Sequence, residues 1–354
     1  MASDSRRDHV VSFPKLGDVA KAANLSSASV SRYLNGSLRL PPETALRIDT
    51  AVASLGYRPN HQARSLSRGK TDTIGLLLPE IANPFFSRLA AAVEVAADAR
   101  GLGVMLCSSL NRPEREVDYL ARLRRNVVDG LLFATNHVDD GTLARAVDTA
   151  PRVVLIDEDI VGTAVPKIFS DNEQGGRLAA AHLIGFGHTE LAYIGGPRDL
   201  MSARERGMGF ARTVREAGRH LVLERFGPYA RVHGEDAARD LLDLYPEVTG
   251  VFVGSDEILM GVLTVLRERG LRVGEALSIV TFDDAAPLDM LDPPITAIRQ
   301  PIAAMGALAL DRMFDGGGPG GPSVDRLAVE LVSRASVSSP SQQKNRRTTG
   351  QLKG

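Results

Sequence analysis

Residues 16–36 read LGDVAKAANLSSASVSRYLNG, and this stretch decides how the first part of the chain folds. Its apolar residues have the spacing of two short helices, over 16–23 and 27–34, with inward faces at Val19, Ala20, Ala23, Val30 and Leu34. Asn24-Leu25-Ser26 interrupts the pattern, and Ser26 is a good N-cap because its hydroxyl can accept a backbone N–H. A third helix is expected over Glu43–Leu55, ended by Gly56.

The outward face of the second helix carries small and polar side chains, which are Ser27, Ala28, Ser29, Ser31 and Arg32. A short helix with such a face can enter the major groove of DNA, so the two helices are a candidate helix-turn-helix. On these residues alone, a helical hairpin that only packs against its neighbours is the more common case.

The charge of the chain is unevenly distributed. Residues 1–70 hold eleven lysines and arginines against five acidic residues, a net charge of +6, whereas the 354-residue chain has −1. The remainder therefore carries −7. A basic head on an acidic body favours a polyanionic partner for the head, although basic faces are often simply solvated.

From Thr73 onward, strand patterns alternate with helical patterns. The strand candidates are Ile74–Pro79, Gly103–Cys107, Gly130–Ala134, Val153–Asp157, Leu191–Gly195, Gly250–Gly254 and Leu277–Phe282. Helical patterns lie between them, such as Phe86–Arg100, Gly175–Gly185, Arg204–Ala217 and Leu259–Glu268. This alternation predicts an α/β core of two doubly wound, parallel-sheet subdomains covered by helices. Ligands of such sheets bind at the carboxyl ends of the strands.

These patterns predict a domain organisation. We expect a helix-turn-helix domain over 15–59, a hinge helix and linker over 60–71, a ligand-binding and dimerisation domain over 72–334, and a disordered polar tail over 335–354. Within the large domain, the first subdomain is expected to comprise about 72–170 with 300–314, and the second about 171–297 with 320–334.

Several classes of protein are disfavoured by composition and spacing. A single cysteine excludes an intrachain disulfide and a CxxC metal site. No signal peptide and no long apolar span are apparent, which favours a cytoplasmic protein that does not meet a membrane. His182 and His188 lack a third ligand at metal spacing, and Asp283 and Asp284 would point to opposite faces of a strand. No nucleophile–base arrangement, metal site or cofactor site is recognisable.

Several segments of the chain resemble one protein family. Residues 16–36, together with LGYRPNHQARSL over 55–66, resemble the head of the LacI/GalR repressors. The segments IGLLLP over 74–79 and NPFF over 83–86 resemble the start of that family's effector domain, which is itself similar to periplasmic sugar-binding proteins. Several motifs in the same order, covering about residues 15–334, make a chance match very unlikely.

The resemblance implies roles in the head. Ser27, Ala28 and Arg32 fall where the family reads base edges, and Ser29 and Ser31 where it contacts phosphates. The implied DNA-binding set also includes Leu16, Asn35 and Tyr57.

The resemblance also implies a hinge helix that begins near Asn60. Leu66 matches a leucine that the family inserts between base steps in the minor groove, with Ala63 and Arg64 lying along that groove. Without the resemblance, Leu66 would be read as a linker residue. So short a helix is unstable alone, which implies a homodimer on a pseudo-palindromic operator in double-stranded DNA.

A third set of residues is implied to bind a sugar-like effector. It consists of Asn83, Phe85, Phe86, Asp157, Arg206, Ser255, Asp283 and Gln300, with Phe226 or Tyr229 closing the pocket. Two residues depart from the pattern. Glu158 stands where a pentose-binding protein would have arginine, and Ser255 stands where asparagine is usual.

The function favoured by these observations is a transcriptional regulator, which we expect to be a repressor controlled by a sugar-like effector. A solute receptor for transport is one alternative, but the basic head and missing export signal count against it. A sugar-processing enzyme is another, without any catalytic arrangement to support it.

Overall fold

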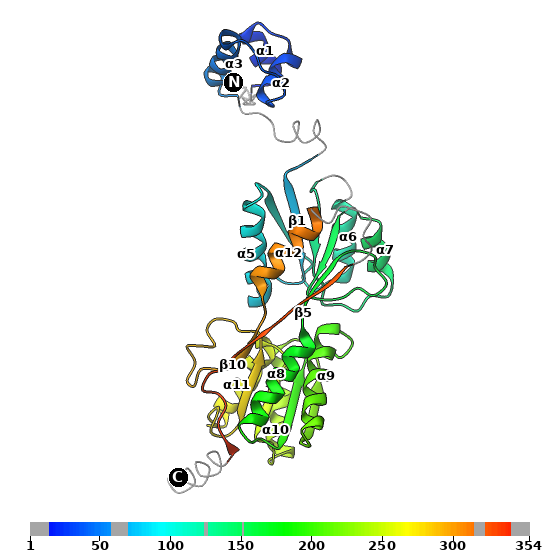
Figure 1. Ribbon diagram of the computed structural model, residues 1–354, viewed down its shortest axis with the longest axis vertical. Helices are drawn as coiled ribbons and strands as arrows, with labels where there is room; N and C mark the ends of the chain where they lie inside the picture. Colours follow the sequence, from blue (N-terminus) through cyan, green and yellow to red (C-terminus); the bar gives the residue numbers. More distant parts are fainter. Residues whose placement is uncertain (1–13, 58–69, 124–126, 151, 315–322, 341–354) are drawn as a thin grey trace, which may run out of the picture. The chain divides into compact units, whose positions relative to one another are not determined.

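The structure is a computed structural model that describes residues 14–57, 70–123, 127–150, 152–314 and 323–340 (Figure 1). The chain divides into two compact units, residues 1–71 and residues 72–354. Each unit has its own hydrophobic core. Among the described residues, no helix combines the length and the apolar character that crossing a bilayer requires.

The first unit contains three helices, α1 (Leu16–Ala23), α2 (Ser27–Leu34) and α3 (Pro42–Leu55). Its core is small, and Val19, Val30 and Ile48 are completely buried in it. The Ser26 hydroxyl accepts the Ser29 N–H at 3.1 Å, which confirms the expected cap of α2. The third helix begins one residue earlier than expected, at Pro42, because proline fits the first position of a helix, where no N–H is needed.

The second unit is built on two six-stranded sheets, each with helices on both faces, as the sequence predicted. The first sheet has the order β11-β5-β4-β3-β1-β2. Its strands are β1 (Thr73–Leu78), β2 (Gly103–Ser108), β3 (Leu131–Phe133), β4 (Val153–Ile156), β5 (Lys167–Ser170) and β11 (Val324–Leu327). Its helices are α5 (Pro84–Asp98), α6 (Pro113–Leu123), α7 (Thr142–Asp148) and α12 (Ile302–Phe314), with α5 and α12 packed together on one face.

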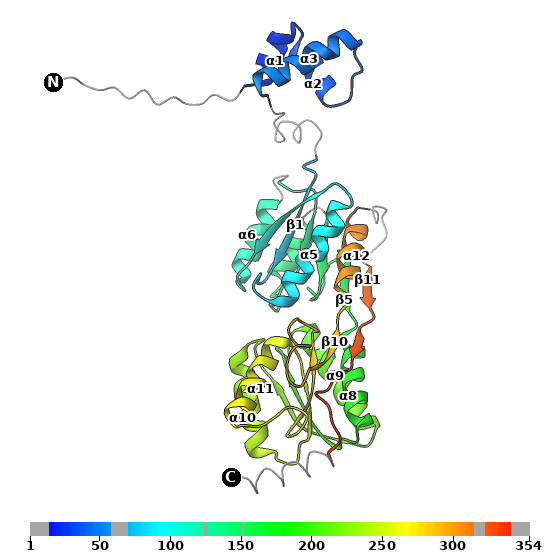
Figure 2. The same cartoon turned by 90° about the vertical axis from the view of Figure 1, so that its left-hand side faces the viewer.

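The second sheet has the order β12-β10-β9-β8-β6-β7. Its strands are β6 (Glu190–Gly195), β7 (His220–Phe226), β8 (Gly250–Val253), β9 (Ser278–Phe282), β10 (Thr296–Arg299) and β12 (Glu330–Val332). Figure 2 shows helices α8 and α9 on one face of this sheet and α10 and α11 on the other. These helices span Asn172–Gly185, Met201–Glu216, Arg231–Leu244 and Asp256–Glu268.

The chain passes between the two sheets three times, after β5, after β10 and after β11. The expected assignment of 320–334 to the second subdomain is wrong for β11, which pairs in parallel with β5 in the first sheet. Asp325 in this strand accepts two hydrogen bonds from Arg312 of α12, at 2.7 and 2.6 Å. This bidentate ion pair ties β11 to the first subdomain.

The prediction of a disordered tail over 335–354 is wrong for its first residues. Ser336 and Val337 are buried against the second sheet. The Ser336 hydroxyl donates to the Ile279 carbonyl at 2.7 Å and accepts the Thr296 N–H at 2.8 Å. A serine-rich composition suggested disorder, whereas these hydroxyls complete the hydrogen bonding of two buried strands. Residues 341–354 lie outside the described part of the chain.

Helices α8 and α9 approach each other closely because glycines lie at their crossing. A Cβ atom on Gly176 would overlap the Arg206 carbonyl oxygen, and one on Gly209 would overlap the Glu173 carbonyl oxygen. The absence of side chains at both positions lets the two backbones meet. This contact positions the start of α9, which carries functional candidates described below.

We expect Gly176→Ala to destabilise the chain by about 1–3 kcal/mol or more, because the added methyl group must push α8 and α9 apart. Urea unfolding followed by circular dichroism would measure the change. Gly185→Ala is the matched control in the same helix. Nothing lies within 4 Å of its added Cβ atom, so it should be neutral or stabilise by up to ~1 kcal/mol. Equal midpoints for the two variants would contradict the close crossing.

Candidate functional site

A cleft of about 550 Å³, partly open to solvent, lies in the second unit where strands of both sheets end. Its lining combines three aromatic rings with many polar groups, which is the composition expected of a site for a polar small molecule. Eight of the nine predicted effector residues line it, and these are Asn83, Phe85, Phe86, Asp157, Arg206, Ser255, Asp283 and Gln300. The sequence therefore located the cleft, although a ligand-binding role for each residue remains a prediction.

Phe226 is the exception among the predicted effector residues. Its ring packs against Tyr193, with centroids 5.6 Å apart, and lies under the Arg198 guanidinium at 4.4 Å, away from the cleft. Tyr229, the alternative, lines the cleft, and its hydroxyl lies 3.2 Å from the Ser202 hydroxyl. Phe226 packs against the apolar cluster around Tyr193 because it has no polar group. Tyr229 has a hydroxyl, which finds a hydrogen-bond partner in the cleft.

Arg206 is the principal cation of the cleft lining and is only 4% exposed. Its Nε donates to the Asn172 side-chain oxygen and its Nη1 donates to the Gly254 carbonyl, both at 2.8 Å. The guanidinium also lies 3.6 Å from the centroid of the Phe282 ring. These contacts fix the plane of the guanidinium, which can then present its remaining N–H groups in one orientation.

Asp157 and Asp283 directly follow β4 of the first sheet and β9 of the second. Both adopt left-handed backbone conformations, with φ of 76° and 73°, which are unusual for aspartate and are found at functional sites. Asp283 accepts a hydrogen bond from Gln300 at 2.5 Å, and Gln300 accepts one from Ser170 at 2.6 Å. By contrast, no group among the described residues donates to the Asp157 carboxylate, which leaves both its oxygens available to a ligand.

The helix α2, the candidate for reading DNA, belongs to the first unit. Ser27, Ala28 and Arg32 are exposed on it, with the Arg32 Nε only loosely bonded to the Ala28 carbonyl at 3.4 Å. The other predicted contacts of this unit, Leu16, Ser29, Ser31, Asn35 and Tyr57, are half-buried. Leu16 and Tyr57 pack against the small core. The hinge residues Asn60, Ala63, Arg64 and Leu66 lie outside the described residues.

Comparison with known proteins places both units in one family. Residues 15–60 match the model of bacterial regulatory proteins of the lacI family, and residues 180–337 match a periplasmic binding protein-like domain. The regulator DegA of Bacillus subtilis is 32% identical over 82% of this chain and 87% of its own length. The chain belongs to the LacI family. It is accordingly a DNA-binding transcriptional regulator and not an enzyme, as the sequence predicted.

Other LacI-family relatives extend the comparison. The ribose operon repressor of Halalkalibacterium halodurans is 35% identical over 82% of this chain and 87% of its own length. The lac repressor dimer bound to operator and an anti-inducer has a TM-score of 0.81 at 27% identity, covering 93% of this chain and all of that one. A complex of the regulator CelR with cellobiose has a TM-score of 0.68 at 32% identity, covering 91% and 99%.

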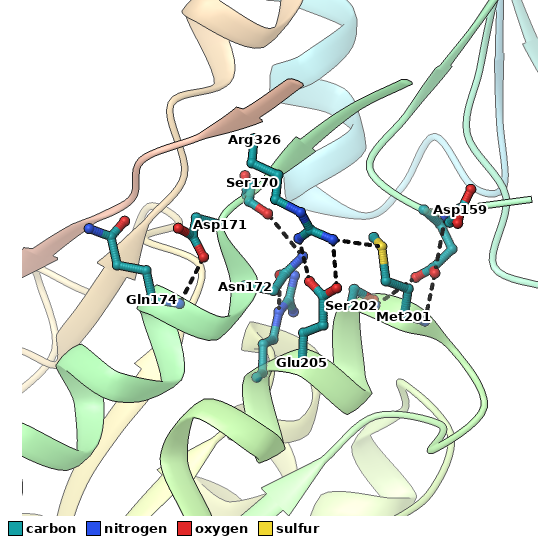
Figure 3. A network of polar contacts seen from close by, with 11 residues as sticks. Asp159, Ser170, Asp171, Asn172, Gln174, Met201, Ser202, Glu205 and Arg326 are labelled. Carbon is teal, nitrogen blue, oxygen red and sulfur yellow. Dashed lines mark hydrogen bonds and ion pairs between the residues drawn. The ribbon is translucent and has the colours of Figure 1, made fainter. Parts of the chain in front are cut away.

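Glu158, which departs from the sugar-binding pattern of the family, has a structural partner. It follows β4 in the first sheet, and its carboxylate accepts the backbone N–H groups of Met201 and Ser202 at 2.7 and 3.2 Å. These groups open α9 on the second sheet, where the helix dipole favours a negative charge. Near this junction Arg326 of β11 donates twice to Glu205 of α9, at 2.6 and 2.7 Å (Figure 3). Both contacts join the two subdomains.

Six further residues line the cleft that were not predicted from the sequence, namely Glu80, Asn111, Asn136, Ser202, Asp256 and Glu257. Two of these had a visible signal, because Ser202 lies one turn before Arg206 and Asp256 follows Ser255. Asn83 also has a second role. Its side-chain oxygen caps α5 by accepting the Phe85 N–H at 2.8 Å, while its Nδ2 donates to Glu257 at 2.9 Å across the cleft. Within the described residues, no group of three potential metal ligands is clustered.

The carboxylates of the cleft outnumber its cations, and this imbalance affects their titration. Burial raises the pKa of Asp157 from 3.8 to about 7, with Arg206 opposing the shift and Glu158 and Asp283 adding to it. Burial likewise raises the pKa of Asp256 to about 7, with Asp283 and Glu257 contributing. Near neutral pH both groups are therefore protonated to a greater extent than an exposed aspartate.

Titration of Asp157 should add a downward slope to the stability of the chain between about pH 4 and pH 7, opposite in sign to the contribution of His188, whose pKa burial lowers to about 4. Between these values the folded state retains a proton on Asp157 that the unfolded state has lost. Asp157→Asn should remove the contribution of Asp157, while Asp256 still titrates, and should stabilise the chain at pH 8 by on the order of 1–3 kcal/mol, since one pKa unit corresponds to ~1.4 kcal/mol. Urea unfolding at several pH values measures both effects.

Asp243→Asn serves as the opposite control. Its hydrogen bond from Arg269 lowers the pKa of this exposed carboxyl, so removing the charge should not stabilise the chain at pH 8. If the stability of Asp157→Asn changes with pH as steeply as that of the unmodified chain, Asp157 is ionised in the folded state.

Proposed function

We propose that this regulator is a repressor whose operator binding is controlled by a sugar-like effector bound in the cleft. The observation that carries the proposal is the set of converging groups on Arg206, Asp157, Asp283 and Gln300 beside two phenylalanine rings. Carboxylates accept from sugar hydroxyls, a guanidinium donates to hydroxyl and ring oxygens, and aromatic faces cover the apolar side of a sugar ring. The names of the ribose operon repressor and the CelR–cellobiose complex support a sugar.

The proposed switch is closure of the cleft. Asn83 and Phe85 come from the first subdomain, whereas Arg206 and Asp283 come from the second, so a ligand that touches both sets favours the closed arrangement. It can shift the equilibrium only by the difference in its affinity for the two arrangements. The contacts of Glu158 with α9 and of Arg326 with Glu205 join the same two subdomains.

We further propose that the regulator acts as a homodimer on a pseudo-palindromic operator, in the cytoplasm. The eight residues of α2 can touch only a few base pairs, and a second copy doubles the sequence that is read. The operator-bound lac repressor dimer supports this assembly. The membership of the LacI family argues against the two alternatives, a transport receptor and a sugar-processing enzyme.

Arg206→Ala should abolish effector binding and the effector's action on DNA, while basal operator binding persists. Isothermal titration calorimetry with a panel of pentoses, hexoses and disaccharides identifies the effector, and gel shifts with DNA flanking the gene measure the response. Phe226→Leu is the matched control, because its side chain lies outside the cleft, and it should leave the affinity within about twofold. A variant of Arg206 that responds with the unmodified midpoint would refute the proposed site.

Arg32→Ala should weaken operator binding by about 1–3 kcal/mol if this arginine donates to a guanine, and should leave binding to random DNA nearly unchanged. Fluorescence anisotropy with operator and scrambled duplexes, at one fixed salt concentration, measures the ratio. Lys21→Ala, an exposed cation on α1, is the control for loss of charge alone. If both variants lose the same affinity on both duplexes, Arg32 contacts phosphate and does not read a base.

A further inference from the structure

A second recess, of about 1110 Å³, lies on the outer side of α9, away from the effector cleft. We call it the arginine groove and define it by Arg198, Arg204, Met208, Arg212, Arg215 and Phe226, and the acidic residues Glu173 and Glu224 also line it. Four of these residues form one stripe along α9, at Arg204, Met208, Arg212 and Arg215. Arg198 and Phe226 form the other wall, from the loop before α9 and the end of β7.

The charge of the groove is only partly balanced by the chain itself. Glu224 lies 3.4 Å from Arg198, while Glu173 and Glu216 lie 3.6 and 2.8 Å from Arg212. Arg204 and Arg215 are exposed, and no acidic side chain within the described part of the chain forms an ion pair with either. Nearby Glu205 is engaged by Arg326 and is not available to Arg204. Two guanidinium charges are therefore left facing solvent.

Apolar side chains lie between these two charges, next to Arg212 and its glutamate partners. Met208 is 55% exposed, and the half-buried Ala211 and Phe226 flank it. Arginine, methionine and phenylalanine are enriched in protein–protein interfaces, whereas lysine is depleted, and all four cations of the groove are arginines. A flexible methionine beside an aromatic ring offers an adaptable apolar contact. The composition is thus that of an interface centre with charged ends.

We propose that the arginine groove docks an acidic amphipathic helix of a partner protein. Arg204 and Arg215 are eleven residues apart on α9, which places them ~16 Å apart at a rise of 1.5 Å per residue. A partner helix lying along α9 matches this spacing with two carboxylates that are also eleven residues apart. Apolar side chains four and seven residues after the first carboxylate would lie over Met208 and Ala211.

A partner bound at this location could influence the effector cleft through α9. The same helix carries Ser202 and Arg206 on its inner face, where they line the cleft, and Arg204 and Met208 on its outer face. A partner on the groove and a ligand in the cleft would therefore contact opposite sides of α9. Any coupling between them must be reciprocal, so that each changes the other's affinity by the same factor.

The test uses the full chain and a fluorescein-labelled, alanine-rich peptide of 18 residues, long enough to be partly helical. The peptide has glutamates at positions 3 and 14 and leucines at positions 7 and 10. Its control has glutamine in place of both glutamates. Fluorescence anisotropy should show saturable binding of the glutamate peptide, weakening as NaCl rises from 50 to 300 mM, and at least tenfold weaker binding of the glutamine peptide.

The variant Arg204→Glu with Arg215→Glu should weaken peptide binding at least tenfold, and Met208→Ala should weaken it several-fold at every salt concentration. Arg145→Glu with Arg267→Glu reverses the same number of exposed arginine charges outside the groove and should leave the affinity within twofold. If circular dichroism shows that the glutamate variant is unfolded, Arg204→Gln with Arg215→Gln replaces it, with the same expectation.

Three outcomes would overturn the proposal. The first is no saturable binding of the glutamate peptide to the unmodified chain. The second is equal weakening by the groove variant and by the control variant, which would show that only net charge matters. The third is a change of oligomeric state in sedimentation with the groove variant alone, which would make this face a contact between copies of the chain.

Discussion

The buried guanidinium of Arg206 is the interaction on which the effector-binding unit depends most. It stands among carboxylates that would otherwise repel one another, and its bonds to Asn172 and Gly254 fix α9 against the elements that follow β5 and β8. A buried cation is stable only when its hydrogen bonds and nearby charges are satisfied. The acidic residues that can receive sugar hydroxyls and the arginine that holds them together therefore depend on each other.

Around Arg206, hydrogen bonds between residues of the two subdomains join them to each other. Glu158, which follows a strand of the first sheet, accepts hydrogen bonds from the N-terminus of α9. Arg326 donates hydrogen bonds to Glu205, and Asn83 donates one to Glu257. Glu158 stands where a pentose-binding protein would have arginine, and this difference is informative in this light. A residue type that would serve the ligand has been exchanged for one that serves the helix N-terminus. In the proposed site, Arg206 and the amides around it are then the groups left to orient a ligand.

Much of this architecture could be predicted from the sequence, because buried parallel strands appear as apolar runs and strand ends carry the ligand groups. Apolar runs predicted β4 and β9, and the ends of these strands pointed to Asp157 and Asp283. The pattern failed for β7, β11 and β12, which are edge strands with polar residues and half-exposed faces. It failed also for β5 and β10, which are buried but have only four residues each, with a charged residue at one end. It failed also for Glu80, Asn111 and Asn136, which reach the cleft from loops whose course depends on the whole fold. Phe226 and Tyr229 could not be separated, since only the packing around Tyr193 decides which one turns inward.

The three passages of the chain between the sheets have a consequence for how the protein is made. The first sheet obtains α12 and β11 only from residues beyond 300, so it cannot be completed until nearly the whole chain has left the ribosome. Until then the edge of β5 lacks its neighbour, and the apolar face that α12 covers stays in water. Chains with such late-completed cores expose surfaces on which aggregation begins. A cell that synthesises this regulator must therefore protect an unfinished first subdomain throughout translation of the second.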